Sequence, residues 1–111
     1  MTVGELAEKI GGTIVVDKAD AEISSAYTSD LLSDVMGHCG DESALITIQN
    51  HLNTIAVCTL VGVEVIVICH DRPVPEDMKA AAEREEVAIV TTPISQFAAS
   101  VALSGLRPAG K

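Results

Sequence analysis

Aromatic residues are almost absent from this sequence. Tyr27 and Phe97 are the only two among 111 residues, and there is no Trp. Proteins that bind single-stranded nucleic acid stack bases on aromatic side chains, so the composition argues against that class. It also requires a hydrophobic core built from Val, Ile, Leu and Ala. Hydrophobic residues nevertheless make up 48% of the chain and charged residues 21%, which is typical of a folded protein rather than a disordered one.

Basic residues are also few. The chain has seven Lys and Arg against sixteen Asp and Glu, and its formal net charge is −9. Proteins bind nucleic acids and anionic lipid surfaces through cations that neutralise phosphate groups. We therefore expect no nucleic-acid partner and no membrane partner.

Long apolar runs and paired cysteines are missing as well. No apolar run reaches the roughly 18 residues that a membrane-spanning helix needs, and no charged-then-apolar signal segment opens the chain. Cys39, Cys58 and Cys69 form no CxxC pair, and the last two lie in apolar runs, where a free thiol acts as a small hydrophobic group. These features predict a reduced, cytoplasmic protein.

The hydrophobic pattern that is present predicts one domain over residues 1–111. Three strand–helix units follow one another over 44–61, 63–86 and 87–105, and such units pack as parallel strands joined by right-handed crossovers. The predicted fold is a small three-layer α/β domain, with a mostly parallel central sheet and helices on both faces.

Shorter elements precede these units. Thr2 and Glu5 have the spacing of a capping box, and the helix that they begin is expected to stop at Gly11. The β-branched run 13–16 predicts a strand, and 23–28 is a weaker strand candidate.

The boundaries of two later helices depend on predicted caps. Asn50 is expected to cap a helix that runs to about Leu60, with Gly62 behind it. The final helix is expected to have Thr92 as its cap and Pro93 at its first position. The apolar residues that fall on one face of this final helix are Ile94, Phe97, Ala98 and Val101.

The position of a ligand site follows from the predicted sheet. Ligands of open parallel sheets bind outside the carboxyl ends of the strands, where loops meet helix N-termini. The junction at 49–53 is the richest in polar groups, and free N–H groups at the start of its helix favour a phosphate or carboxylate. His51 is placed to donate to that anion, and Arg72 to complete the charge. The predicted ligand-binding residues are Thr47, Gln49, Asn50, His51, Asn53 and Arg72.

An ordinary alternative explains the same residues. Asn50 caps the helix while Gln49 and Asn53 are solvated, because polar residues are common at helix starts.

No metal site and no catalytic residue are predicted. The pairs His38-Cys39 and Cys69-His70 are adjacent in sequence, whereas zinc sites use CxxC pairs or His residues at helical spacing. Cys39 lies in an expected exposed loop without a positioned base. The chain has no GxxxxGK[ST] phosphate-binding loop, and the sequence assigns no cofactor.

Two carboxylates stand four residues apart in a further predicted helix. This helix is expected to begin at Ser29 and to end at Gly37, so Asp30 and Asp34 share one face of it. Paired carboxylates support acid–base catalysis or bind a cation. The simpler interpretation is that Ser29 caps the helix, Asp30 complements its dipole and Asp34 faces water.

The chain resembles the DRTGG-domain family in two stretches, 27–36 (YTSDLLSDVM) and 45–57 (LITIQNHLNTIAV). The strand 63–69, the helix after Pro75 and the sequence Thr-Thr-Pro at 91–93 follow the same pattern, so the resemblance covers nearly the whole chain. It is strongest for short stand-alone members, which are similar to the N-terminal domain of HPr kinase/phosphorylase. Such members occur in anaerobes near iron-only hydrogenase genes. In larger proteins the domain is an accessory piece that looks regulatory or dimer-forming.

The chain departs from this family in two respects. The stretch 49–53 stands where the Asp-Arg-Thr-Gly-Gly motif is expected, and Asp71-Arg72 follows a different strand. The phosphate-binding loop of HPr kinase lies in a separate domain, so the resemblance implies no kinase activity.

These observations together predict a non-catalytic regulatory or interaction module. We expect it to homodimerise and to bind a small anionic metabolite, and the resemblance implies a redox or hydrogenase-associated protein as a partner. The apolar helix 52–61 suits either a buried dimer face or the core. One alternative is a small enzyme or enzyme subunit that uses His51 as acid or base, assisted by Asp30 or Asp34. The other is a protein-interaction adaptor with no small-molecule site.

Overall fold

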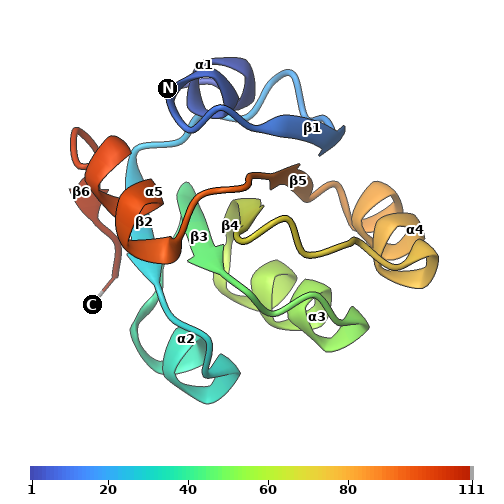
Figure 1. Ribbon diagram of the computed structural model, residues 1–111. Helices are drawn as coiled ribbons and strands as arrows, with labels where there is room; N and C mark the ends of the chain where they lie inside the picture. Colours follow the sequence, from blue (N-terminus) through green and yellow to red (C-terminus); the bar gives the residue numbers. More distant parts are fainter. Residues whose placement is uncertain (111) are drawn as a thin grey trace.

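One six-stranded sheet runs through the computed structural model, which describes residues 1–110 (Figure 1). The strand order is β1-β5-β4-β3-β2-β6, and every neighbouring pair is parallel except β1 and β5. The strands are β1 (Thr13–Val16), β2 (Ser25–Thr28), β3 (Ser43–Thr47), β4 (Val63–Ile68), β5 (Ala88–Thr91) and β6 (Arg107–Pro108). The helices are α1 (Val3–Lys9), α2 (Leu32–His38), α3 (Leu52–Val61), α4 (Glu76–Glu85) and α5 (Gln96–Ala102).

The helices cover the sheet in two layers. α2, α3 and α4 lie on one face, and α1 and α5 lie on the other (Figure 1). The chain crosses the sheet from β2 to β3, β4 and β5, each strand being the neighbour of the one before. Because the crossovers that join these strands are right-handed, their helices lie on the same face of the sheet. After β5 the chain returns to β6 beside β2, and α5 covers the opposite face on this return. The predicted three-layer α/β fold with a mostly parallel sheet is confirmed.

The sheet divides the core into two halves. Alternate residues of β3 belong to different halves: Ala44 and Ile46 pack towards α1 and α5, whereas Leu45 packs towards α2 and α3. All five residues of β3 are buried, as expected for a strand covered on both faces. Tyr27 is half-buried and Phe97 is exposed, so the core is aliphatic, as the composition predicted.

Local signals correctly predicted several helix ends. Glu5 N donates to Thr2 Oγ1 at 3.1 Å and Thr2 N donates to Glu5 Oε1 at 2.9 Å, which completes the predicted capping box. α3 ends at Gly62, whose φ of +86° lies in the left-handed region. A side chain at this position would also collide with the carboxylate of Asp41, so both the conformation and the space require glycine.

Two predicted caps are wrong. The N-cap of α3 is His51 instead of Asn50, and the N-cap of α5 is Ser95 instead of Thr92. The Thr92 hydroxyl donates to the backbone oxygen of Ile10 at 2.7 Å and so fastens the end of α1 to the sheet. Both predicted cap side chains have partners that are distant in sequence, and a local pattern does not contain those partners.

The segment 23–38 also differs from its prediction. β2 begins at Ser25 instead of Ile23, and α2 begins at Leu32 instead of Ser29. α2 then continues through Gly37 to its last residue, His38.

α5 directs part of its apolar face away from the core. Phe97 is 79% exposed and Val101 is 56% exposed, whereas Ala99 and Leu103 are buried. The face predicted from Phe97 and Val101 is therefore a surface of the molecule.

Candidate functional site at the carboxyl edge of the sheet

Four loops meet at the carboxyl ends of β2, β3, β4 and β5, because these strands are parallel neighbours. Asp30, in the loop after β2, is the centre of hydrogen bonds to the loop after β3 and to α5, which follows the loop after β5. Its Oδ1 accepts from Thr47 Oγ1 at 3.0 Å, from Ile48 N at 3.0 Å and from Gln96 Nε2 at 2.9 Å. Its backbone oxygen accepts from Gln49 Nε2 at 2.7 Å. We call these five residues the Asp30 hub.

The hub determines what two of the predicted ligand-binding residues do. Thr47 is fully buried, and its hydroxyl both donates to Asp30 and accepts from Gln49 N at 3.1 Å. Thr47 and Gln49 therefore hold the β3–α3 loop in place. Asp30 precedes α2, so the predicted helix face shared by Asp30 and Asp34 does not exist.

Asn50 positions a cation beside this loop. Its side chain is 8% exposed, and Nδ2 donates to the backbone oxygen of Pro73 at 2.7 Å. Its Oδ1 accepts from Arg72 Nη2 at 3.2 Å. Arg72 is exposed, so its Nη2 bonds to Asn50 while further N–H donors of the guanidinium group stay open to solvent.

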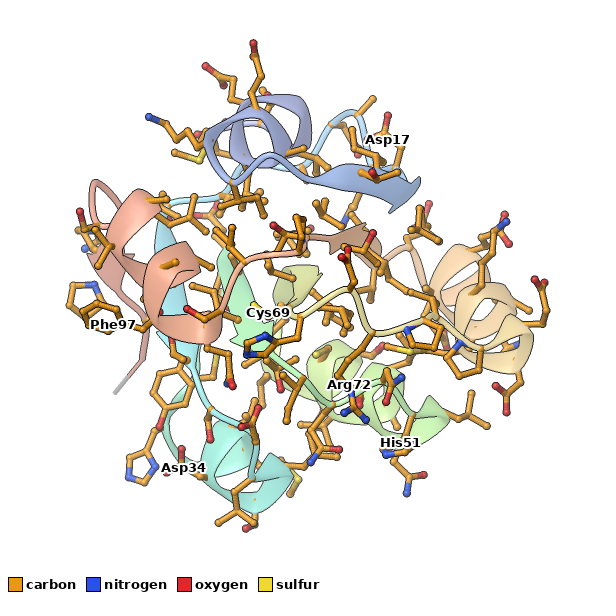
Figure 2. The ribbon with its side chains drawn as sticks, viewed as in Figure 1. Asp17, Asp34, His51, Cys69, Arg72 and Phe97 are labelled. Atoms are coloured by element: carbon orange, nitrogen blue, oxygen red, sulfur yellow. The ribbon has the colours of Figure 1, made fainter. Side chains whose placement is uncertain are left out.

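The start of α3 carries the remaining predicted residues. His51 and Asn53 are exposed, and the His51 side chain makes no capping hydrogen bond. The first turn contains no acidic residue, and Thr54 N is the first amide to bond back to His51 O, at 3.0 Å. The amides of the first turn therefore keep the partial positive charge of a helix N-terminus. Arg72 bonds to Asn50, the residue before His51, so the cation and the start of α3 belong to the same corner of the molecule (Figure 2).

The turn after β4, which leads into Arg72, contains two residues with strained backbones. His70 and Asp71 both have left-handed backbones, with φ of +60° and +53°. Their amides donate to the backbone oxygens of Ile94 at 3.1 Å and Thr92 at 3.0 Å. Such a conformation costs about 1 kcal/mol or more per residue and persists only when surrounding contacts impose it, and functional sites are where it most often occurs.

The cysteines are structural. Cys39, Cys58 and Cys69 are all free and fully buried. The sequence predicts an exposed loop for Cys39, but Cys39 directly follows α2, and its Sγ lies 3.3 Å from Ser43 Oγ. Burial, together with the nearby charge of Asp30, raises the pKa of Cys69 to about 11, so this thiol stays protonated and is a poor nucleophile.

Asp34 belongs to a separate group of hydrogen-bonded side chains at the surface, with Tyr27 and His38. Tyr27 Oη donates to Asp34 Oδ2 at 2.6 Å, and His38 Nδ1 lies 3.2 Å from Asp34 Oδ1. The Tyr27 hydrogen bond lowers the pKa of Asp34, and the carboxylate in turn raises the pKa of Tyr27 to about 12. Asp34 lies well apart from His51 in Figure 2, so it is not placed to assist His51 in acid–base chemistry.

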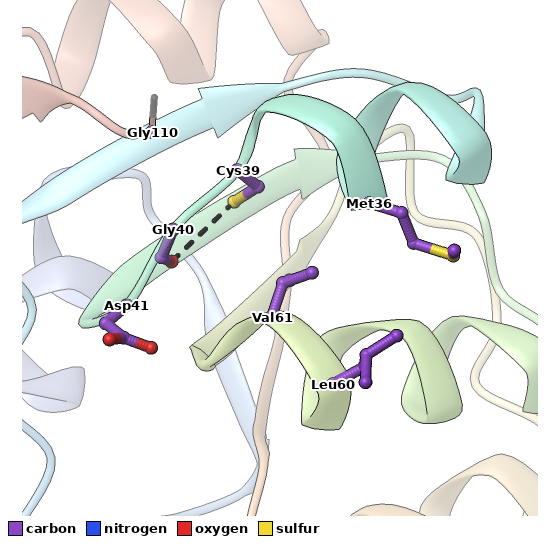
Figure 3. A pocket seen from close by; sticks show the side chains of 7 residues that line it. All are labelled: Met36, Cys39, Gly40, Asp41, Leu60, Val61 and Gly110. Atoms are coloured by element: carbon purple, nitrogen blue, oxygen red, sulfur yellow. Dashed lines mark hydrogen bonds between the residues drawn. The ribbon is translucent and has the colours of Figure 1, made fainter.

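A hollow at the opposite end of the sheet contains none of the predicted residues (Figure 3). It measures about 470 Å³ and lies between the ends of α2 and α3. The residues that line it are Met36, Cys39, Gly40, Asp41, Leu60, Val61 and Gly110. Among residues 1–110, its lining includes one carboxylate, that of Asp41.

A groove between α3 and α4 instead adjoins the predicted site. It also measures about 470 Å³, and Leu52 and Asn53 of the first turn of α3 form one end of it. Arg84 and Glu85 of α4 line the other side. A ligand whose charged group contacts the start of α3 therefore has space for a larger uncharged part.

Two kinds of feature are absent from residues 1–110. No group of three or more His, Cys, Asp or Glu side chains is arranged to hold a metal ion. No helix in this range combines the length and apolar character needed to cross a membrane.

No protein-family model matches the chain, and no curated protein matches it. Its fold is similar to a crystal structure of the CBS and DRTGG domains of the regulatory region of Clostridium perfringens pyrophosphatase, complexed with the activator diadenosine tetraphosphate. The TM-score is 0.70 over 90% of this chain, at 10% sequence identity. The chain spans 44% of the length of that structure. The similarity shows that this chain has a fold found in a regulatory region, and it agrees at that level with the DRTGG resemblance of the sequence.

Proposed function

We propose that this chain is a non-catalytic regulatory module that binds a small anionic ligand at the start of α3. One observation carries the proposal: the uncapped, acid-free first turn of α3 lies beside Arg72, whose guanidinium group Asn50 holds in place. The positive charge of this corner is unusual in a chain whose net charge is −9. Helix amides and an oriented guanidinium group are the donors that phosphate and carboxylate groups prefer.

The six predicted residues take two roles in this proposal. Thr47, Gln49 and Asn50 position the loop, and His51, Asn53 and Arg72 contact the ligand. The groove between α3 and α4 accepts the uncharged part of a larger anion, such as a nucleoside phosphate. The structural neighbour, whose regulatory region was crystallised with a nucleotide activator, supports this class of ligand.

A thermal-shift screen tests the proposal. The purified protein is heated with nucleotides, phosphorylated metabolites, carboxylates and divalent metals in turn. A ligand at a hundred times its Kd should stabilise the folded state by about 2.7 kcal/mol through mass action. We expect His51→Ala and Arg72→Ala to abolish the shift for the selected anion.

Lys9→Ala is the matched control, because it removes one positive charge from α1 on the opposite face of the sheet. The control should retain the full shift. His51→Ala should change the melting temperature without ligand very little, because the exposed His51 side chain makes no capping bond. A shift that survives both substitutions would exclude this site. The absence of any shift, with a partner protein retained in a pull-down, would favour the adaptor alternative.

We also propose that the module self-associates into a homodimer. Exposed apolar side chains on α5 support this, because Phe97 and Val101 are 79% and 56% exposed. On α3, Leu52 and Leu60 are 45% and 70% exposed. The predicted helix 52–61 is thus partly core and partly surface. A role beside a redox or hydrogenase-associated protein remains an implication of the family resemblance.

A further inference from the structure

The exposed face of α5 combines a projecting aromatic ring with a hollow. Phe97, Val101 and Ser104 follow one another at helical spacing, and Phe97 points away from the molecule in Figure 2. A hollow of about 330 Å³ lies beside the same helix. Ser100 of α5 forms one wall of it, together with Leu103 and Ser104, which directly follow the helix. The phenyl ring and the hollow therefore lie on one continuous surface.

The other wall of the hollow comes from the edge of the sheet. Ala26 of β2, with Leu106, Arg107 and Pro108 around β6, lines it. β6 is only two residues long and contains Pro108, which has no amide hydrogen, so this edge is unsuited to pairing with another strand. Contacts on this side of the molecule must therefore use side chains.

Charge indicates which partner fits this surface. The segment 87–106 contains no Asp, Glu, Lys or Arg, although the whole chain has a net charge of −9. Two copies of such a chain repel each other unless they meet through an uncharged face. The hollows beside α3 include the carboxylates of Asp41 and Glu85, whereas Arg107 is the only charged side chain among residues 1–110 that lines the hollow beside α5.

We propose that two copies of this chain pair through α5, and that Phe97 of each copy enters the hollow of the other. This inference rests on the proposed self-association and names its surface. In a two-fold symmetric dimer both copies use the same surface, so each contact occurs twice. A ring and a hollow on one surface fit this symmetry, because the ring of each copy can enter the hollow of the other. Inside the hollow the ring contacts Leu106 and Pro108, and the Arg107 guanidinium group lies against its face as a cation–π partner.

The size of this surface sets the strength of the dimer. A standard interface takes about 800 Å² from each partner, whereas the whole surface of this chain measures 5427 Å². The proposed surface consists of one seven-residue helix and a two-residue strand, so we expect a weak dimer that dissociates on dilution.

Sedimentation equilibrium over a hundredfold range of concentration tests the proposal on the full chain. We expect the wild-type protein to change from monomer to dimer over this range. Phe97→Glu, which removes the ring, and Ser104→Arg, which fills the hollow from its rim, should each weaken dimerisation at least tenfold. Far-ultraviolet circular dichroism should be unchanged, because both side chains are exposed.

Leu60→Glu is the matched control, since it places the same charge on the exposed face of α3. This variant should dimerise like the wild type. A wild-type protein that stays monomeric throughout would overturn the self-association itself. A dimer that survives Phe97→Glu and Ser104→Arg, or one that only Leu60→Glu disrupts, would overturn the α5 surface while leaving self-association in place.

Discussion

Asp30 and Asp34 are four residues apart, yet they have separate roles. Asp30 accepts hydrogen bonds from β3, from the loop after β3 and from α5, and so joins both helix layers across the carboxyl edge. Asp34 belongs to α2 and accepts from Tyr27 at the surface. The difference arises because the chain turns from β2 into α2 between them, which places one carboxylate at the edge of the sheet and the other on a helix.

Removal of the Asp30 carboxylate should destabilise the protein. In Asp30→Ala the fully buried Thr47 hydroxyl loses its acceptor, and Ile48 N and Gln96 Nε2 lose theirs. We expect the free energy of unfolding to fall by about 2 kcal/mol in urea denaturation. Asp20→Ala, at an exposed acid, should change it by less than about 0.5 kcal/mol. Equal effects in the two variants would show that the hub contributes nothing to stability.

The Tyr27–Asp34 hydrogen bond should be visible in a pH titration. Tyr27 is the only Tyr and there is no Trp, so the near-ultraviolet absorbance of phenolate reports this one group. We expect the pKa of Tyr27 to be about 12 in the wild type and to fall towards the ordinary value of 10.0 in Asp34→Asn. A wild-type midpoint near 10 would contradict the hydrogen bond.

The same pair should make the free energy of unfolding, measured by urea denaturation, fall at both high and low pH. The folded pKa of Tyr27 is raised, so its contribution to stability is complete below pH 10 and is lost as the pH rises through about 12. The folded pKa of Asp34 is lowered from 3.8, so its contribution is present above that pH and is lost as the pH falls through the folded value.

At the scale of elements, two glycines at the ends of helices should respond in opposite directions to the same substitution. Gly62 has a φ of +86°, and a Cβ there would collide with Asp41. Gly37 lies within α2, and no atom lies within 4 Å of the position of its Cβ. We expect Gly62→Ala to lower the free energy of unfolding by about 1 to 3 kcal/mol, and Gly37→Ala to raise it by about 0.5 to 1 kcal/mol. Effects of one sign, measured by urea denaturation, would contradict the helix ends described here.

The elements that the sequence predicted correctly are those with purely local causes. β4 is a continuous apolar run, the capping box at Thr2 needs only Glu5, and Gly62 terminates α3 through its own backbone. The caps at Asn50 and Thr92 were predicted wrongly because tertiary partners bind those side chains. The candidate site likewise has one feature that the sequence predicts and one that depends on tertiary contacts. Its position at the carboxyl edge comes from the parallel order of strands, whereas the Asp30–Gln96 bond joins residues 66 positions apart and has no local signal.

At the scale of the whole molecule, the fold separates two surfaces. The start of α3 and Arg72, which form the proposed anion site, lie on the side of the sheet covered by α2, α3 and α4, whereas Phe97 projects from α5 on the opposite face. The Asp30 hub connects the two, because Gln96, the first residue of α5, binds the same carboxylate oxygen as the loop that leads into α3. A ligand at one surface and a second copy at the other can therefore bind together without sharing a residue.

A two-dimensional amide NMR titration tests anion binding at the start of α3. A nucleoside phosphate selected by the thermal-shift screen is added to the wild-type protein and to Arg72→Ala. We expect saturable shifts of the Leu52 and Asn53 amides at the start of α3, which are lost in Arg72→Ala. Shifts that concentrate instead around Met36 and Leu60, or no saturable shift with any anion, would contradict anion binding at this site.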